Sequence, residues 1–556
     1  MFHVKHRKFA RFEFKPGLRG ACRLPHSIVR AMNFAAQLHT ARRDLRYHAD
    51  AAQLFAHLGG LRRTDTVLLE SADIESKKNL LCLAVLDSAL RVRCQGNVVT
   101  AQALTTTGEE ILAKLRTELA EYVLDTPADE RRAATFEFPA SQAADERERL
   151  LATSPAEVLR RLQFSTQYGS GGEESPDLPL LAGGFAYDFL ATFESLPEVA
   201  EGDNTYPDYE FVVAETLLKV DHLSQTAYVC GVATSQHDVD KRLDAYVTAA
   251  EQELTPLPAP EDGVDTTQPL RVSTDFDDKQ FRSHVEALKG NIYQGDIYQV
   301  VPARTFSAPC ADAFASYRRL LQTNPSPYMF YFRGEDYELF GASPESNLKF
   351  SPDTREVQLY PIAGTRPRGL NPDGSVNHEL DIRNELEMRT DHKELAEHTM
   401  LVDLARNDLA RVAVPGTRRV AELLQVDRYS RVMHLVSRVT ATLHEDFDAL
   451  DAYRACMNMG TLTGAPKLRA VDLLRGVEGK RRGSYGGAVG YLGGDGRMDN
   501  CIVIRSAFVR GGQAIIQAGA GVVRDSTPQS EADETVHKAY AVLDAVALGA
   551  PVEVAR

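Results

Sequence analysis

Two pairs of glutamates, far apart in the chain, have the spacing that most suggests chemistry. Glu394 and Glu397 lie in one segment with helical periodicity, and Glu531 and Glu534 repeat the spacing in another. Side chains at i and i+3 leave a helix on one face, about 5–6 Å apart at Cβ. If the two helices meet, four carboxylates converge, and such a cluster needs a cation or a shared proton. Hard oxygen ligands with open positions suit Mg²⁺ that bridges to an anionic substrate.

A simpler interpretation of the same residues is a solvated helix start. Acidic side chains are favoured in the first turn of any helix because they offset the helix dipole. Asp391 and Ser530 are the candidate N-caps of the two segments. Taken alone, each glutamate pair is more typical of such a helix start than of a metal site.

Composition excludes several classes of function. The chain has 556 residues, of which 43% are hydrophobic, enough for two or three domains with a large core. Its net charge of −15 argues against a nucleic-acid-binding protein. No apolar run reaches about 18 residues, so we expect no transmembrane helix. The seven cysteines form no C-x-x-C pair and fit free thiols in a reducing compartment, so we expect a cytoplasmic protein.

Residues 1–31 differ from the rest, with eight Lys or Arg and one Glu. An apolar secretory core is absent from this stretch. A basic nucleic-acid-binding arm is one interpretation. We favour a disordered extension, or translated sequence upstream of a start at Met32.

The glutamate pairs must be positioned by elements that follow a Pro- and Asp-rich segment, 255–270, which we interpret as a linker. It separates a first domain, 32–264, from a second, 271–550. Because several adjacent strands of the second domain are joined by tight turns, we predict antiparallel pairing and an α+β fold. Long helices are expected in it at 277–294, 378–411 and 531–548.

Two isolated polar residues allow a structural and a functional interpretation. Arg505 lies in an apolar strand, so its charge needs either an ion-pair partner or a bound anion. His434, flanked by apolar residues, is more typical of a hydrogen-bonded core residue. Phosphate-loop spacing and a nucleophile elbow are both missing from the sequence, so a self-contained hydrolase or glutaminase is not expected.

Short polar blocks carry a further signal. In chain order they include GASPE (341–345), PIAGTRPRG (361–369), DLARNDLAR (403–411), GTLTGAPK (460–467), GSYGGAVGY (483–491) and QSEADE (529–534). Together they resemble the chorismate-utilising enzymes, and within that family most closely the synthase subunits that make anthranilate. The resemblance implies the family's fold, two mainly antiparallel sheets packed together with helices on the outside. It also implies loss of the C4 hydroxyl of chorismate with Mg²⁺ bound, addition of a nucleophile, and often loss of pyruvate.

The resemblance assigns a role to each acidic residue. Glu397 and Glu534 match the family's Mg²⁺ ligands, and Glu394 and Glu531 match supporting carboxylates. Glu345 matches the general acid for the leaving hydroxyl, a role that requires the protonated form and is favoured by burial.

Other residues match positions around the substrate. Tyr485 and Arg505 match the residues that hold the pyruvyl carboxylate. His434 and Thr461 match residues close to the ring, with His434 the candidate for proton handling during pyruvate loss. The remaining substrate-binding matches are Gly364, Thr365, Gly519 and Gly521.

Two positions indicate the nucleophile. Ala363 stands where aminodeoxychorismate synthases carry a nucleophilic Lys, and alanine cannot form a covalent adduct. Gln299 stands where the water-adding isochorismate and salicylate synthases have a Lys base, and glutamine cannot deprotonate water. Both favour direct attack of ammonia at C2, giving aminodeoxyisochorismate and then anthranilate plus pyruvate in tryptophan biosynthesis.

The resemblance also implies a partner. Since the chain has no glutaminase elbow, a separate glutamine amidotransferase subunit is expected, commonly in a heterotetramer of two plus two chains. Aminodeoxychorismate synthase component I stays open as an alternative, as does a non-catalytic tryptophan-sensing or metal-binding subunit. Ala363 counts against the first, and intact Glu345, Glu397 and Glu534 count against the second.

The first domain resembles a regulatory domain. Glu70 and Ser71 resemble a motif for feedback inhibition by L-tryptophan, and without the resemblance they would be an ordinary strand end. Leu81 is Lys in some relatives, which leaves the affinity for the inhibitor open. The other wall of the inhibitor site would consist of Pro327, Tyr328 and Met329.

Overall fold

The computed structural model describes residues 38–72, 79–124, 131–140, 143, 145–164, 177–262, 265–371, 373, 375–429 and 432–556. The predicted basic extension, 1–31, and Met32 lie outside these ranges.

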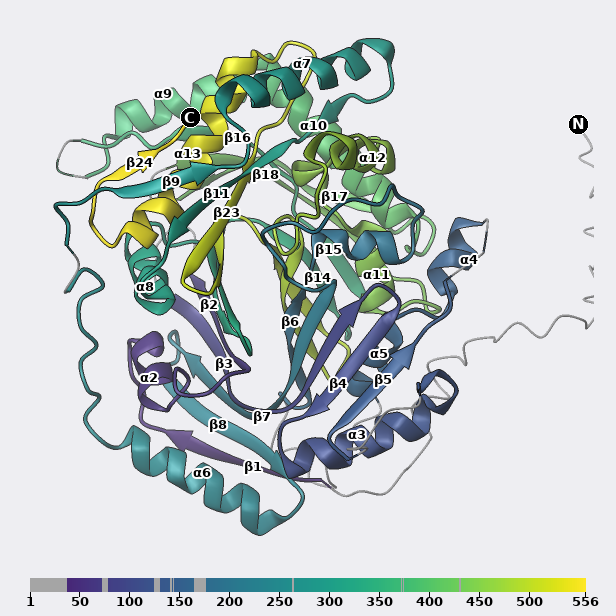
Figure 1. Cartoon of the computed structure of the whole chain (residues 1–556), viewed down its shortest axis with the longest axis vertical. Helices are drawn as coiled ribbons and strands as arrows, with labels where there is room; N and C mark the ends of the chain where they lie inside the picture. The colour runs from purple at the N-terminus through teal and green to yellow at the C-terminus, as the bar shows by residue number, and fades with distance from the viewer. Residues whose placement is uncertain are drawn as a thin grey trace, which may run out of the picture.

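Two long strands form the centre of the fold. β3 (Asn79–Gln95) and β7 (Tyr209–Asp221) pair antiparallel along most of their length. Both are rich in apolar and β-branched residues, and most of their positions are buried, as expected when both faces of a strand are covered. The sheet extends from this pair in two arms (Figure 1).

The first arm continues from β3 and the second from β7. The strands of the first arm are, in spatial order, β2 (Thr66–Ala72), β12 (Tyr328–Arg333), β13 (Tyr337–Ser343), β22 (Ser506–Arg510), β23 (Gln513–Gly519), β11 (Ala303–Pro309), β9 (Leu270–Thr274) and β24 (Val552–Val554). Those of the second are β6 (Leu180–Phe185), β20 (Ala488–Gly493), β21 (Met498–Ile502), β14 (Ser346–Ser351), β15 (Glu356–Leu359) and β18 (Val432–Thr442), with β16 (Ile362–Pro367) and β17 (Arg419–Arg428) also on β18.

Shorter strands complete the sheet at its centre. β3 also carries β4 (Val98–Ala103) and then β5 (Ala133–Glu137), and β7 carries β8 (Thr226–Ala233) and then β1 (His39–Leu45). A separate two-stranded pair consists of β10 (Gln299–Val300) and β19 (Gly464–Ala465).

The prediction of two separate sheets is not confirmed. Within the described residues, hydrogen bonds join 22 strands into one sheet, because β3 and β7 link the two arms without a break. Pairing between the named strands is antiparallel except between β24 and β9, which run parallel. The arms face each other across a shared interior, so the layers resemble a sandwich although the hydrogen bonding is continuous (Figure 1).

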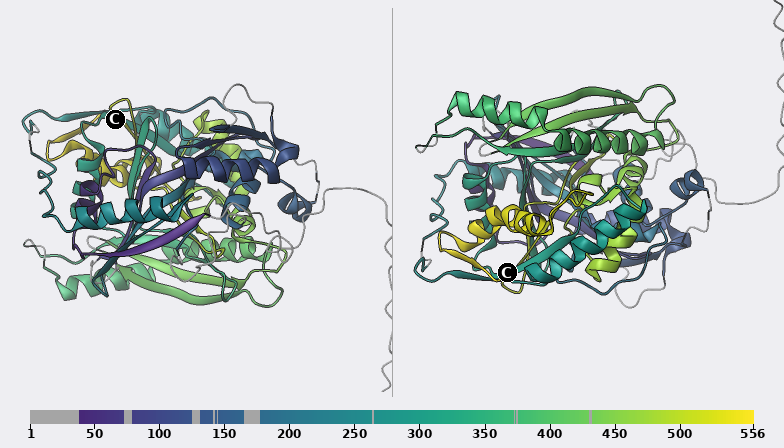
Figure 2. Two further views of the ribbon diagram at one scale, coloured as in Figure 1. Left: turned by 90° about the horizontal axis from the view of Figure 1, so that it is seen from below. Right: turned by 90° about the horizontal axis from the view of Figure 1, so that it is seen from above.

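Helices lie around the outside of the sheet (Figures 1 and 2). Those before β9 are α2 (Ala51–His57), α3 (Thr106–Glu118), α4 (Glu146–Leu151), α5 (Ala156–Phe164) and α6 (Gln236–Ala250). Those after it are α7 (Asp278–Gln294), α8 (Ala313–Thr323), α9 (His378–Thr390), α10 (His392–Ala410), α11 (Ala449–Cys456), α12 (Lys467–Glu478) and α13 (Pro528–Ala547). Short 3₁₀ turns are η1 (Ala120–Tyr122), η2 (Tyr187–Thr192) and η3 (Gly460–Leu462). Figure 2 shows α9 and α10 with β17 and β18 as a layer along one side of the molecule.

Two predicted helix starts differ in their outcome. The segment 378–411 is broken at Asp391, whose side chain accepts a hydrogen bond from the backbone N–H of Glu394 at 3.2 Å, as expected of an N-cap. The last long helix begins at Pro528, with Thr527 rather than Ser530 at the N-cap. Proline suits the first position of a helix because its φ is already helical and it has no N–H to leave unpaired.

The predicted linker lies between α6 and β9 and runs along the outside of the molecule (Figure 1). Strands from its two sides share the sheet, since β2 pairs with β12 and β6 with β20. The division into 32–264 and 271–550 therefore stays a prediction.

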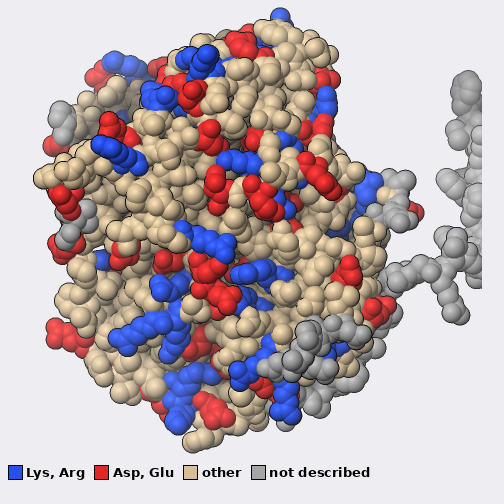
Figure 3. Space-filling model, viewed as in Figure 1, with Lys and Arg blue, Asp and Glu red and all other residues tan. Residues whose placement is uncertain are grey.

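Acidic and basic side chains are interspersed over the face shown in Figure 3. Among the helices of the described ranges, none has the length and apolar character needed to cross a bilayer.

Candidate active site

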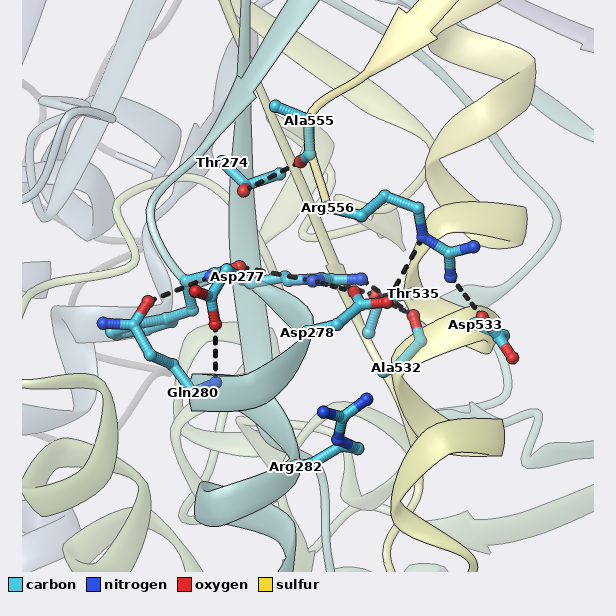
Figure 4. Close-up of polar contacts among 12 residues, drawn as sticks. Thr274, Asp277, Asp278, Gln280, Arg282, Ala532, Asp533, Thr535, Ala555 and Arg556 are labelled. Carbon is cyan, nitrogen blue, oxygen red and sulfur yellow. Dashed lines mark hydrogen bonds and ion pairs between the residues drawn. The ribbon is translucent and has the colours of Figure 1, made fainter.

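The first turns of α13, which carry Glu531 and Glu534, are held by a buried arginine. Arg304 of β11 is fully buried and donates to the hydroxyl of Thr535 at 2.8 Å and to the carbonyl of Ala532 at 2.9 Å. It also pairs with Asp278 at the start of α7, at 2.9 Å. Figure 4 shows this junction, together with the contacts of Arg556 to Asp278 and Asp533. The position of the second glutamate pair is thus fixed by β11, α7 and the C-terminus.

The first glutamate pair projects from the start of α10. Arg366 of β16 donates to Glu394 at 2.8 Å and to Asp391 at 2.8 Å, which ties the helix start to the strand. Glu397 accepts a hydrogen bond from Nε2 of Gln299 at 3.0 Å. A Cβ at Gly521 would lie 3.3 Å from Oε1 of Glu397, so the glycine leaves space beside this carboxylate.

The four glutamates do not form a closed cluster. Glu394 is paired with Arg366, whereas Glu534 is paired with Lys538 at 2.7 Å. Over the described part of the chain, no three His, Cys, Asp or Glu side chains gather closely enough to hold a metal ion. However, Mg²⁺ is commonly bound by one or two carboxylates with substrate oxygens and water, not by an all-protein cage. The donor chemistry and the space beside Glu397 therefore fit an open Mg²⁺ site.

Glu345 lies where the chain passes from β13 in the first arm to β14 in the second. It is buried, and Oγ1 of Thr461 donates to its carboxyl at 3.0 Å. Burial raises the pKa of Glu345 to about 8, against the hydrogen bonds from Thr461 and the backbone of Ile362 and the charges of Lys538 and Arg505. The carboxyl is therefore largely protonated at neutral pH.

Arg505 lies in the reverse crossing, between β21 in the second arm and β22 in the first. Its backbone is left-handed, with φ of 48°, and its carbonyl accepts from Ala342 N–H at 3.1 Å. Its guanidinium donates no hydrogen bond to any residue described here. Its positive charge lowers the pKa of both Glu345 and His434. Of the two interpretations from the sequence, a bound anion fits this side chain better than a fixed ion pair.

His434 of β18 is buried, and its two ring nitrogens differ. Nδ1 lies 3.0 Å from Oγ1 of Thr365 and 3.2 Å from the carbonyl of Gly364, whereas buried Nε2 has no hydrogen-bond partner among the described residues. Burial, reinforced by Arg505, lowers the pKa of His434 to about 3, so the imidazole is neutral. The carbonyl of Gly364 favours the proton on Nδ1, which leaves Nε2 with a free lone pair.

Tyr485 contacts the end of β23. The Gly519 backbone is hydrogen-bonded to the Tyr485 hydroxyl, and Lys538 donates to the Gly519 carbonyl at 3.0 Å. Gln299 is buried beside Gly521, and within the described part of the chain its Oε1 has no hydrogen-bond partner. These contacts bring together loop ends from both arms and α13.

The residues of the predicted inhibitor site lie on two faces of one strand pair. In the antiparallel β2–β12 pair, Ser71 lies opposite Tyr328 and Glu70 opposite Met329. Successive side chains of a strand point to opposite faces, so the two pairs are separated by the sheet. Pro327 directly precedes β12.

The contacts of these residues differ accordingly. Glu70 is buried and accepts a hydrogen bond from the Tyr317 hydroxyl of α8. Its other carboxyl oxygen has no hydrogen-bond partner in the ranges that the structure describes. Burial raises the pKa of Glu70 to about 7. On the other face, the Tyr328 hydroxyl donates to Asp499 of β21 at 3.1 Å, and so links the two arms.

Sequence reasoning missed three cations that hold the site together, Arg304, Arg366 and Lys538. Lys538 follows Glu534 by four residues, a spacing that predicts a helical ion pair. Arg366 belongs to the block PIAGTRPRG, but only the fold shows that it reaches Glu394.

Comparison with known proteins gives a consistent result. A family model described as chorismate binding enzyme matches residues 119–544. The chain is 49% identical over 519 residues to anthranilate synthase component 1 of Vibrio cholerae, covering 92% of this chain and 97% of that protein. It is 50% identical over 502 residues to anthranilate synthase component 1 of Escherichia coli, covering 90% and 95%.

Solved structures agree. Anthranilate synthase component I from Streptococcus pneumoniae superposes with a TM-score of 0.64 at 28% identity, over 83% of this chain and 92% of that one. The menaquinone-specific isochorismate synthase of Escherichia coli gives 0.61 at 17% identity, over 94% and 97%. The second likeness is one of fold alone.

Proposed function

The chain belongs to the chorismate binding enzymes, and we propose that within this family it converts chorismate and ammonia into anthranilate, pyruvate and water. The observation that carries the proposal is the buried carboxyl of Glu345, held by Thr461 and facing the same region as Arg505. A protonated acid near a cation that has no ion-pair partner among the described residues suits an anionic substrate that must lose a hydroxyl group.

The first stage is loss of the C4 hydroxyl and addition of ammonia. Glu345 donates its proton to the departing hydroxyl, which leaves as water. Ammonia forms a bond to C2 and loses a proton, giving aminodeoxyisochorismate. Since Glu345 is neutral at neutral pH, it can act as an acid without a prior protonation step.

The second stage releases pyruvate. The proton on C2 is removed, the C3–O bond breaks, the ring becomes aromatic, and the methylene carbon of the side chain takes up a proton. His434 is suited to the proton removal because Nε2 is unprotonated and accepts no hydrogen bond from the residues that the structure describes. Thr365 and Gly364 hold the imidazole through Nδ1.

Substrate binding relies on the remaining residues. Arg505 and Tyr485 hold the pyruvyl carboxylate. Gly364, Thr365 and Gly521 lie around the ring carboxylate, and Gly519 also binds the substrate. When bound, Mg²⁺ supplies positive charge for the ring carboxylate. Glu397 and Glu534 would hold it, with Glu394 and Glu531 in support.

The choice of ammonia rests on Gln299 and Ala363. Gln299 donates to Glu397 through Nε2, so it orients a carboxylate where a lysine would serve as a base. Ala363 of β16 offers no nucleophile. We also propose that ammonia comes from a separate glutamine amidotransferase subunit, and that L-tryptophan inhibits the enzyme by binding beside Ser71 and Tyr328.

The test is product formation from chorismate, Mg²⁺ and ammonium. Anthranilate, identified by fluorescence and mass, is expected from the native chain and, at a much lower rate, from Glu345→Gln. Formation of 4-amino-4-deoxychorismate or isochorismate would contradict the proposal.

A further inference from the structure

The segment that carries Thr461 is held in place by three cationic side chains, of which Arg482 is buried and Arg411 and Lys467 are partly buried. It runs from the end of α11 through η3 to β19, residues 455–463. Arg411 donates to the carbonyl of Ala455 at 2.9 Å, and Arg482 donates to that of Leu462 at 2.8 Å. Lys467 donates to the carbonyls of Cys456 and Met457 at 2.7 and 3.3 Å.

Lys467 has an unusual position for a cation. It is the first residue of α12, where the helix dipole disfavours positive charge, and its side chain is only 9% exposed. The same ammonium group lies at the C-terminus of α11, where the last carbonyls lack helical partners and positive charge is favoured. Asp408 of α10 completes its shell at 2.7 Å.

Asp408 belongs to the block DLARNDLAR and Lys467 to the block GTLTGAPK, and the proposed function gives neither residue a role. The ammonium group joins α10, α11 and α12 at one point. Only three residues lie between Met457 and Thr461, so a shift at the end of α11 moves the Thr461 hydroxyl away from Glu345.

We propose that the Lys467–Asp408 pair is a positioning device for the reaction, which fixes the end of α11 and so holds the Thr461 hydroxyl against the Glu345 carboxyl. The inference rests on the proposed function of Glu345 as the acid. Lys467 acts through Thr461 and does not itself touch the substrate.

The sign of the expected effect follows from the hydrogen bond. Thr461 donates to Glu345, which stabilises the ionised carboxylate and lowers its pKa relative to burial alone. The other charged or titratable groups that face Glu345 are Lys538 of α13, Arg505 after β21, and Tyr429 after β17. None of these groups is altered when the Thr461 contact is lost. The pKa of Glu345 should then rise, and the pH above which kcat declines should rise with it.

The experiment compares the pH dependence of kcat, at fixed free ammonia, in Thr461→Val, Lys467→Met and the double variant. We expect both single variants to move the alkaline limb upward by about 0.5–1 pH unit, with no further shift in the double variant. We also expect kcat of Lys467→Met to fall at least about tenfold, and Lys467→Arg to recover part of both effects.

Arg469→Met is the matched control. It removes a cation two residues further along α12 whose ion pairs with Asp296 and Asp472 are exposed, and it should leave both kcat and the limb unchanged. If Lys467→Met does not fold, Asp408→Asn takes its place. This substitution keeps the side-chain shape and one acceptor oxygen, so the alkaline limb should move by a smaller amount.

Two results would overturn the inference. One is a lowered kcat with an unmoved alkaline limb in Lys467→Met, or in Asp408→Asn where that variant is used. The other is an alkaline limb that lies at higher pH in the double variant than in Thr461→Val alone. Failure of the native chain to form anthranilate would instead refute the proposed function, so the two outcomes are distinguishable.

Discussion

Glu345 and His434 are tuned in opposite directions by the same cause. Burial disfavours charge on both, so it raises the pKa of the carboxyl to about 8 and lowers that of the imidazole to about 3. At neutral pH the acid therefore carries its proton and the base carries none. Residues that must donate and accept protons in successive stages are ready without prior exchange with solvent.

The pH profile tests the acid. Because the folded-state pKa of Glu345 is raised, the protonated form is present below about 8 and is lost as pH rises through that value. We expect kcat, measured at saturating Mg²⁺ and a fixed concentration of free ammonia, to decline above that pH. Glu345→Gln should show low activity without this decline. A native rate that stays level through this range would exclude Glu345 as the acid.

Substitution of His434 tests the base. His434→Asn keeps a polar side chain near Thr365 but removes the lone pair of Nε2. Proton removal by a positioned base contributes about 10²–10⁴-fold, so pyruvate release should slow by about that factor. We expect aminodeoxyisochorismate to accumulate, detected by mass. If the variant forms anthranilate and pyruvate as fast as the native chain does, another group removes the proton.

At the scale of elements, the site is built where the chain crosses between the two arms. Glu345 and Arg505 occupy adjacent crossings, β13 to β14 and β21 to β22, and β18 adds His434. The two glutamate pairs come from two different helices. Arg366 contacts the start of α10, and Arg304 contacts the first turns of α13. Loops at the ends of one continuous sheet thus supply groups that are far apart in sequence.

The β2–β12 pair predicts different effects for two neighbouring residues. Ser71 faces Tyr328 and the interior between the arms, whereas Glu70 faces Tyr317 of α8. We expect Ser71→Ala to raise the L-tryptophan concentration for half inhibition about tenfold, through loss of a hydrogen bond worth about 1.5 kcal/mol, with unchanged activity on ammonium. Inhibition curves with and without the substitution measure this.

Glu70→Gln provides the comparison. Its carboxyl contacts Tyr317 on the opposite face, so the substitution should alter thermal stability more than it alters direct inhibitor contacts. Unchanged inhibition by L-tryptophan in Ser71→Ala would show that the inhibitor does not bind at the face that carries Ser71 and Tyr328.

How far the sequence predicts these elements depends on whether the signal is local. Asp391 is a correct N-cap because capping depends on adjacent residues. The i, i+3 spacing of Glu394 and Glu397 likewise follows from helix geometry alone. By contrast, the contact of Gln299 with Glu397 and that of Thr461 with Glu345 join residues about a hundred positions apart, and no local pattern encodes them.

At the scale of the whole molecule, the continuity of the sheet was the feature least accessible from sequence. Alternating strands on both sides of 255–270 suggest two units, but periodicity does not say which strand edges pair. The pairs β2–β12 and β6–β20 bring together strands more than 250 residues apart. A core cluster also combines residues such as Phe185 and Tyr453 from the two sides, with their rings stacked at 4.3 Å.

Calorimetry tests whether the two sides are independent. Since unfolding of either side would expose strand edges and core of the other, we expect a single cooperative transition. Two separate transitions, with the lower one shifted by L-tryptophan alone, would support independent domains at 32–264 and 271–550.

The most direct test of the central claim is the fate of labelled ammonia. The native chain is incubated with chorismate, Mg²⁺ and ¹⁵N-ammonium, and the products are separated and measured by mass. We expect anthranilate that carries the ¹⁵N label and one pyruvate for each anthranilate formed. A product without nitrogen, or a labelled amine that retains the pyruvyl side chain as its final form, would contradict the account.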